Sequence, residues 1–196
     1  MRTKQGNKEE AILTAAVKVF AESGYHAAKI HSIADEAGIA AGSIYSYFEN
    51  KQQIILALFD DVWKELYEQI SPVEKDNTLT ADAKFDMLID IVIDVFTVDR
   101  NLALVVVNEE SHLIRDYPEE FTPYFEKFMK SGEAIVKEGV IKRQFRSDIK
   151  IDLLRILILG QIRSLLLTWA IGDKKISIQA MKEDLKKFIK CGINRV

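Results

Sequence analysis

The sequence has only one cysteine, Cys191, among 196 residues. One thiol cannot form an internal disulfide, so we expect a protein of the reducing cytoplasm with an inert thiol near its C-terminus. Long uncharged apolar runs are also absent: the aliphatic stretch 153–167 is interrupted by Arg155, Gln161 and Arg163. It falls short of the roughly 18 apolar residues that a membrane span needs, so we expect no membrane association. The charged N-terminal segment does not have the pattern of a signal peptide.

Motifs of known catalytic chemistry are also missing. The chain has no phosphate-binding glycine loop, no nucleophile elbow and no cluster of metal ligands, and His26, His31 and His112 are scattered. Glu109 and Glu110 are adjacent, so on a helix they point about 100° apart and cannot form a facing acid–base pair. We therefore predict that the protein is not an enzyme and that it needs no cofactor and no metal.

The charge balance excludes indiscriminate binding to nucleic acid. The net charge is −3, and residues 1–51 contain six basic and six acidic side chains. A neutral segment can still bind DNA if its bases face the phosphates and its acids face away. Lys51 and the bases near the N-terminus are the candidates for such contacts. The hydrophobic share of 48% makes a disordered chain an unlikely alternative.

Residues 30–51 predict two short helices joined by a tight turn. Gly38 stands where a helix end requires a left-handed residue. Asn50 begins a capping-box pattern that ends at Gln53 and opens a third helix. The apolar positions that give each short helix one buried face are Ile30, Ile33, Ala34 and Ala37 in the first, and Ile44 and Phe48 in the second. This arrangement is a helix-turn-helix.

The second short helix has an unusual composition for a solvent face, because its residues between 41 and 47 are small or aromatic and carry no charge. Small residues allow close approach to a surface, and hydroxyl groups can bond phosphate oxygens or base edges. The alternative is a tightly packed core helix. Tyr45 and Tyr47 are two positions apart and point to different sides, so both cannot be core. The composition therefore favours DNA recognition.

At these residues the chain resembles the TetR family of bacterial transcriptional repressors. The resemblance is carried by residues 20–25 (FAESGY), 33–39 (IADEAGI), 42–48 (GSIYSYF) and 50–51 (NK). It implies an all-helical dimer that binds a palindromic DNA operator through the head and a ligand in a larger body. The residues expected to meet DNA are Lys29, Ala41, Gly42, Ser43, Tyr45, Ser46, Tyr47 and Lys51. The chain departs from the family pattern at Ala28, Lys29, Ala41 and Ser46, where Thr, Ser or Thr, Lys and His are common.

The rest of the chain predicts further long helices, and thus an all-α protein of about nine helices. A capping box at residues 7–10 is expected to open the first helix. The later helices are predicted at residues 51–70, 81–98, 101–114, 121–140, 151–171 and 178–190, with a loop at residues 71–80. The expected division is a DNA-binding domain at residues 1–50 and a ligand-binding and dimerisation domain at residues 51–196.

The predicted body has many aromatic residues, most of which are ordinary core residues on general grounds. Helical bundles are nevertheless a common place for apolar ligand cavities. The candidate ligand-binding residues are Trp63, Tyr67, Phe96, His112, Phe125, Phe128, Gln161 and Trp169. For His112 a solvent-facing position is the alternative. A hydrophobic or amphipathic effector is expected, and similarity to fatty-acid-responsive family members suggests a long-chain acyl-CoA.

The helix predicted at residues 151–171 is apolar on more than one face, so one face needs a partner. Gly160 and Ser164, four positions apart, permit close helix contact, and Leu166 is expected at a homodimer interface made with the last helix. The alternative is a fully internal helix. We predict a ligand-responsive repressor. The rival interpretation is a protein-interaction or architectural module that uses the helix-turn-helix for packing alone.

Overall fold

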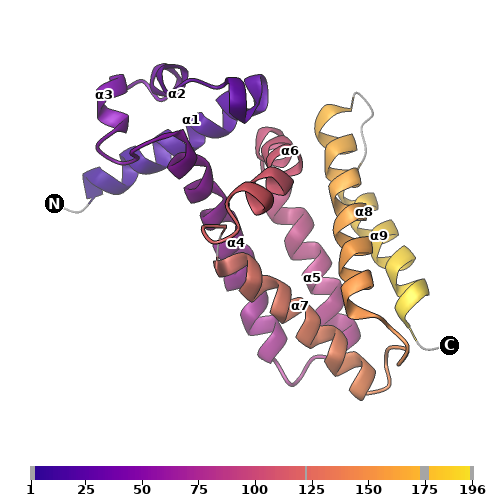
Figure 1. Ribbon diagram of the computed structural model, residues 1–196. Helices are drawn as coiled ribbons and strands as arrows, with labels where there is room; N and C mark the ends of the chain where they lie inside the picture. The colour runs from indigo at the N-terminus through magenta and orange to yellow at the C-terminus, as the bar shows by residue number, and fades with distance from the viewer. Residues whose placement is uncertain (1–2, 122, 173–176, 195–196) are drawn as a thin grey trace.

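The computed structural model describes residues 3–121, 123–172 and 177–194, with side chains described from residue 8 onward. Over these residues the chain forms nine helices and no β-strand, which confirms the all-α prediction. They are α1 (Thr3–Ala27), α2 (Ile30–Glu36), α3 (Ala41–Ile44), α4 (Lys51–Lys75), α5 (Ala81–Phe96), α6 (Arg100–Asp116), α7 (Pro123–Ile141), α8 (Ile151–Ile171) and α9 (Ile178–Ile193). Helices α1–α3 form a head at one end of α4, and α5–α9 form the body around its other end (Figure 1).

The head folds around apolar residues of its short helices, as their spacing predicts. Ile33, Ile44 and Phe48 are buried there. Gly38 adopts φ 66°, the left-handed conformation expected at the turn between α2 and α3. α1 begins at Thr3, so the capping box predicted at residues 7–10 does not open it, although the side chain of Asn7 lies outside the described residues.

The start of α4 is capped by its own sequence and is tied to α1. Asn50 Oδ1 accepts a hydrogen bond from Gln53 N at 2.9 Å, as the capping pattern predicts, while Gln53 Oε1 accepts from the N–H of Glu49. Lys51 Nζ donates to the carbonyl oxygens of Tyr25, His26 and Ala28 at 2.6, 3.0 and 2.8 Å. This ammonium group binds carbonyls around the C-terminal end of α1, where a positive charge is favourable.

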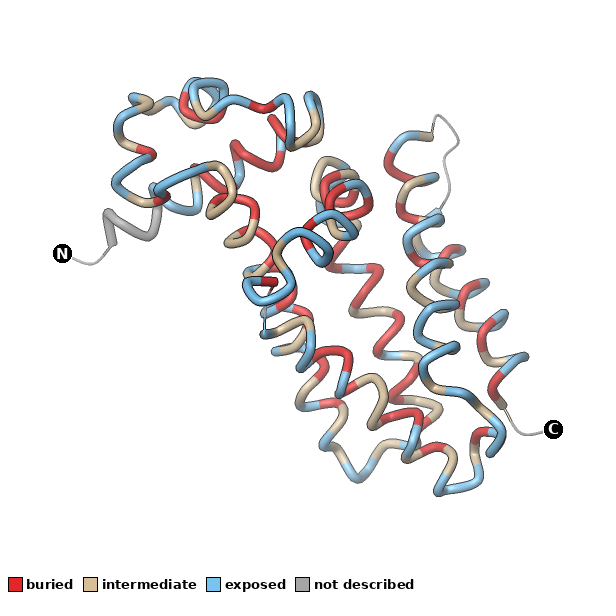
Figure 2. The backbone as a smooth tube through the Cα atoms, in the orientation of Figure 1, coloured by how far each residue is buried: buried red, intermediate tan, exposed pale blue. Residues whose placement is uncertain are grey.

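α4 is longer than its sequence suggests. It was predicted to end at Ile70, before Pro72, but it continues through Pro72 to Lys75. Pro72 lies in the last turn, where its missing N–H removes only one hydrogen bond near a helix end that frays easily. Buried apolar residues recur along the helix from Ile54 to Val73. Figure 2 shows buried segments of α4 both near the head and in the body. One continuous helix therefore packs in both parts of the molecule.

A buried lysine holds the C-terminal end of α4 in the body. Lys84 is 1% exposed, and its Nζ donates to Glu74 O at 2.7 Å and to Glu138 Oε2 at 2.8 Å. The Ser131 hydroxyl donates to Glu74 Oε2 at 2.7 Å. These bonds join α4, α5 and α7, and they satisfy a carbonyl in the last turn of α4.

α9 is fastened to α5 by a ladder of ion pairs between residues spaced four apart on each helix. The pairs are Lys182 with Asp94, Lys186 with Asp90, and Lys190 with Asp82 and Asp86, all at 2.5–2.8 Å. α9 was predicted to end at Lys190, but it runs through Gly192 to Ile193. Its end is held because Ile193 is buried and its carbonyl accepts from Arg146 N at 2.9 Å.

The buried position of Lys84 predicts a measurable contribution to stability. Lys84→Met keeps the apolar stem but leaves the Glu74 carbonyl without its donor, so the free energy of unfolding should fall by about 1–3 kcal/mol in urea titrations. The control is Lys142→Met, which removes an exposed partner of the same Glu138 and should cost less than about 1 kcal/mol. Equal losses in the two variants would contradict this role.

Candidate functional site

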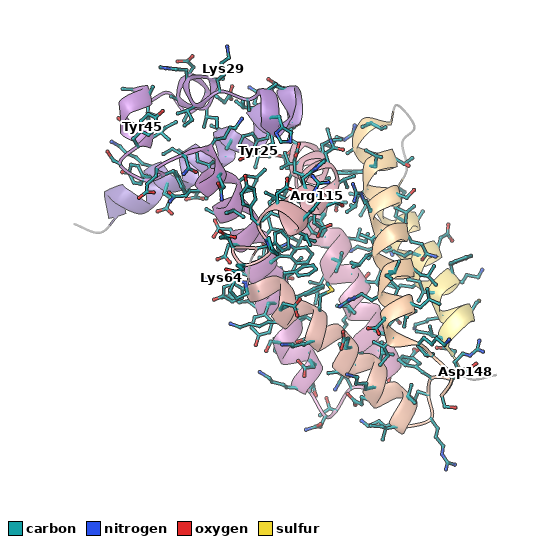
Figure 3. All side chains as sticks on the ribbon, viewed as in Figure 1. Tyr25, Lys29, Tyr45, Lys64, Arg115 and Asp148 are labelled. Carbon is teal, nitrogen blue, oxygen red and sulfur yellow. The ribbon has the colours of Figure 1, made fainter. Side chains whose placement is uncertain are left out.

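The outer face of the head presents the residues predicted to meet DNA. In Figure 3, Lys29 and Tyr45 lie on the side of the head that faces away from the body. Tyr45 is 57% exposed. Gly42 and Ser46 are exposed as well, whereas Ala41, Ser43 and Tyr47 are partly buried. A Cβ atom at Gly42 would have no atom within 4 Å. The fold itself therefore does not require glycine at this position.

Lys51 is the predicted DNA-binding residue with the most internal contacts. Besides its three carbonyl acceptors, its Nζ lies 4.7 Å from the centre of the Tyr25 ring. Burial lowers the pKa of Lys51, although the carboxylate of Glu109 opposes that effect. These contacts give Lys51 a structural role in the head, and its contact with a DNA phosphate stays a prediction.

The body contains a partly open apolar cavity with a volume of about 110 Å³, enclosed by α4, α5, α6, α7 and α8. This volume exceeds by several-fold the roughly 10–15 Å³ that one water molecule needs on the same scale. Representative lining residues are Trp63 from α4, Val92 and Phe96 from α5, Phe128 from α7 and Leu166 from α8. An apolar chain can therefore occupy the interior of the body.

Four charged residues line the same cavity: Glu110, Glu133, Arg155 and Arg163. Arg155 lies 3.7 Å from Glu133, and Arg163 donates a hydrogen bond to the Ser111 hydroxyl at 2.6 Å. Burial raises the pKa of Glu110 to about 7, although the Arg163 guanidinium opposes that rise. Sequence reasoning did not select any of these four as ligand-binding residues.

The structure brings together three of the eight predicted ligand-binding residues: Trp63, Phe96 and Phe128 line the cavity. Phe125 packs against Trp63 with ring centres 4.9 Å apart, outside the lining. The other four do not line it: Tyr67 packs on Tyr124, Trp169 lies under the Arg100 guanidinium, His112 lies beside His26, and Gln161 has a buried side-chain oxygen without a hydrogen bond in the described residues.

α6 connects the cavity with the head. Val106, Val107 and Glu110 line the cavity, and the neighbouring Glu109 accepts a hydrogen bond from Tyr25 N at 3.2 Å. Glu109 is 8% exposed, so this bond is shielded from water. Burial and the neighbouring Tyr117 raise the pKa of the Tyr25 hydroxyl to about 12. Adjacent glutamates on one helix thus face two different parts of the molecule.

The joint between head and body also carries a cluster of polar rings and charges. His26 of α1 and His112 of α6 have ring centres 6.0 Å apart. Arg115 lies 2.9 Å from His112 Nδ1 and pairs with Asp116 at 2.8 Å. Glu109 and His112 of the polar stretch 108–112 therefore meet the head. His112 is exposed, as its solvent-facing alternative held, but its contact with His26 was not predicted from the sequence.

One face of α8 carries exposed apolar side chains. Leu153, Ile156, Leu157 and Ile171 are between 52% and 65% exposed, and Phe188 on α9 is 68% exposed. Leu166, expected on this face, is instead 2% exposed and lines the cavity, so that prediction was wrong. The helix is apolar all round, and its sequence alone does not distinguish the inner face from the outer one.

Comparison with known proteins agrees with this architecture. Residues 12–58 match the family model described as "Bacterial regulatory proteins, tetR family", and residues 59–192 match the model "YsiA-like protein, C-terminal region". A helix-turn-helix head on a helical body defines a transcription regulator of the DNA-binding class. The chain belongs to the TetR family of transcriptional regulators.

The relatives are transcription regulators, and one of them is a regulator of fatty acid metabolism. The chain is 28% identical over 183 residues to the "Fatty acid metabolism regulator protein" of Bacillus subtilis, covering 93% of this chain and 94% of that protein. It is 29% identical over 157 residues to the "HTH-type transcriptional repressor KstR2" of Rhodococcus jostii, covering 76% and 73%. The structure of the transcriptional regulator FadR from Bacillus subtilis in complex with stearoyl-CoA superposes with a TM-score of 0.82 at 28% identity, covering 94% of this chain and 99% of that one.

The exposed position of Lys29 predicts a contact with a DNA phosphate. Lys29→Ala should lower affinity about equally for all duplex sequences and should reduce the slope of log affinity against log salt by about one. Fluorescence anisotropy over a range of salt concentrations measures both effects. Lys64→Ala is the control, because Lys64 is exposed on α4 at the level of the body (Figure 3). A loss confined to one duplex sequence, or an equal loss in the control, would contradict the phosphate contact.

Proposed function

We propose that this protein is a ligand-responsive transcriptional repressor that binds a palindromic operator as a dimer and releases it when an amphipathic acyl ligand enters the body. The observation that carries the proposal is the position of α6. The same turn of this helix supplies Glu110 to the cavity and Glu109 to the head. A ligand that displaces α6 therefore changes both the cavity wall at Glu110 and the contact of Glu109 with the head.

DNA binding is assigned to the head, residues 1–50, and ligand binding and dimerisation to residues 51–196. Exposed Tyr45 and Ser46 supply hydroxyl groups, and Gly42 lets the backbone of α3 approach a groove closely. Lys29 supplies a charge contact where the family pattern has a hydroxyl. These features support a cytoplasmic DNA-binding regulator, and they do not fit a head that serves packing alone.

The ligand is assigned to the acyl-CoA class on three grounds. The cavity is apolar over most of its lining, which suits an alkyl chain. Arg155 and Arg163 add positive charge to that lining, and guanidinium groups bind phosphates well. A related structure contains stearoyl-CoA. A long-chain acyl-CoA combines the alkyl chain with a phosphorylated head group.

Release of DNA follows from the connection between cavity and head. Two heads must match successive major grooves, about 34 Å apart along the duplex. A ligand that moves α6 and the body end of α4 tilts each head, because α4 continues into the head without a break. The heads then no longer match the groove spacing, and affinity for the operator falls.

The dimer is assigned to the exposed apolar face of α8 and α9. A Cβ atom at Gly160 would meet no atom within 4 Å, so the subunit's own packing does not explain this glycine. It lies one turn from Ile156 and Leu157, where close approach of a second α8 would bury both. By length and composition α8 could also cross a membrane. We favour a second copy because Arg155 and Arg163 interrupt the helix.

Substitution on this face tests the dimer. Ile156→Glu places a charge in the proposed apolar interface, where it cannot be solvated, and should convert a wild-type dimer into monomers in sedimentation velocity runs. Ile141→Glu is the control, because Ile141 is 81% exposed at the end of α7. A monomeric wild-type protein, or a dimer that persists in the Ile156→Glu variant, would overturn the interface.

Selection from a pool of random duplexes, followed by gel-shift titration, tests the function itself. We expect enrichment of a palindromic sequence and its release on addition of dodecanoyl-CoA. Coupling of this kind is typically 1–3 kcal/mol, so the operator affinity should fall by roughly 5- to 150-fold. Failure to enrich any duplex would support the rival interpretation, a protein-interaction or architectural module. Enrichment of a duplex that dodecanoyl-CoA does not release would contradict the proposed acyl ligand.

A further inference from the structure

Glu110 is an unusual residue for the wall of an apolar cavity. It faces the space also lined by Trp63, Val106, Val107 and Leu166, and it makes no hydrogen bond among the described residues. Glu110 is partly buried, and a carboxylate that loses hydration against apolar side chains is unfavourable unless a partner satisfies it. The nearest compensating charge is Arg163, whose guanidinium already donates to the Ser111 hydroxyl. The Glu110 carboxylate in the cavity wall therefore has no hydrogen-bond partner among the described residues.

Trp63, whose ring lines the same cavity, has an unpaired donor behind the cavity wall. Trp63 is 2% exposed, and its Nε1–H is buried without an acceptor in the described part of the chain. A buried donor without a partner costs free energy that an incoming acceptor recovers. An occupant reaches Glu110 more directly than this donor, and the group that suits Glu110 is a neutral or donating one.

We propose that Glu110 makes this cavity select neutral acyl derivatives, such as thioesters and amides, over free fatty acids. The proposal rests on the acyl-ligand function proposed above and names the residue that sets its specificity. A neutral acyl group offers a carbonyl oxygen, and an amide also offers an N–H. A free carboxylate offers acceptors alone and places a second negative charge beside Glu110 in an apolar space.

The surrounding charges define how the selection depends on pH. Arg163 and Arg155 face the cavity from α8 and Glu133 faces it from α7, while the lining residues of α4 and α5 are uncharged. Burial raises the pKa of Glu110 to about 7. Above that pH the side chain is ionised and repels a carboxylate; below it the side chain is neutral and repels nothing. Discrimination against the free acid should therefore grow as the pH rises through 7.

Two ligands with the same alkyl chain and different terminal groups show the effect of the terminal group alone. Dodecanamide and dodecanoate differ in charge at the end of one alkyl chain, and calorimetric titration gives their affinities. For the wild-type protein at about pH 8, we expect dodecanamide to bind at least about tenfold more tightly. The ratio should shrink at about pH 6, where Glu110 becomes mostly neutral. Because dodecanoate also takes up a proton more readily at lower pH, a variant at Glu110 assigns the effect to this residue.

Glu110→Gln removes the charge and keeps the shape, so the ratio at about pH 8 should fall well below its wild-type value. Glu133→Gln is the matched control, because Glu133 lines the same cavity but is paired with Arg155. It should keep the wild-type ratio. An unchanged ratio in Glu110→Gln, or tighter binding of dodecanoate by the wild-type protein, would overturn the proposal. The second result would mean that Arg163 governs the site.

Titration with dodecanoyl-CoA separates this inference from the proposed function. Binding of dodecanoyl-CoA together with equal affinities for the amide and the acid would overturn the role of Glu110 alone. Binding of none of the three probes would overturn both the acyl-ligand function and the inference. Tight binding of dodecanoyl-CoA and dodecanamide with weak binding of dodecanoate at about pH 8 supports both.

Discussion

The structure depends on one constraint: α4 has to pack in the head and in the body without a break. Its first residue, Lys51, binds three carbonyl oxygens around the end of α1, and its last turn is held by the buried ammonium group of Lys84. At 1.5 Å per residue, a helix of 25 residues is about 38 Å long, so a tilt of about 5° at the body end moves the head by about 3 Å. A small change in body packing is thus sufficient to misplace the DNA-binding face.

α6 links the ligand cavity to the head. It lies between the cavity and the head, and Glu109 and Glu110 face these two regions from one turn. The hydrogen bond from Tyr25 N to Glu109 crosses the joint between head and body in a buried setting, where its loss is costly. A ligand that shifts Glu110 changes the position of Glu109 as well, because both belong to the same rigid turn. The proposed response therefore requires no long chain of intermediate contacts.

Sequence periodicity was sufficient for most of the helices, because they bury one apolar stripe, and for the turn at Gly38. Periodicity did not predict residues whose partners are distant in the sequence. Lys84 has the sequence pattern of a surface lysine, and only the fold brings Glu74 and Glu138 to its ammonium group. Periodicity also failed for Leu166, since a helix that is apolar all round gives no sign of which face is inside. A signal for the glutamates did exist. Glu109 and Glu110 follow the buried Val106 by three and four positions, so helical spacing places both beside its buried stripe.

The central claim is that the cavity and the DNA-binding face are coupled, and coupling between two binding sites is reciprocal. The most direct measurement is the affinity for dodecanoyl-CoA of the free protein and of the protein saturated with its selected operator. The account predicts that operator DNA weakens ligand binding by the same factor by which the ligand weakens operator binding, roughly 5- to 150-fold. Equal ligand affinities with and without operator would contradict it.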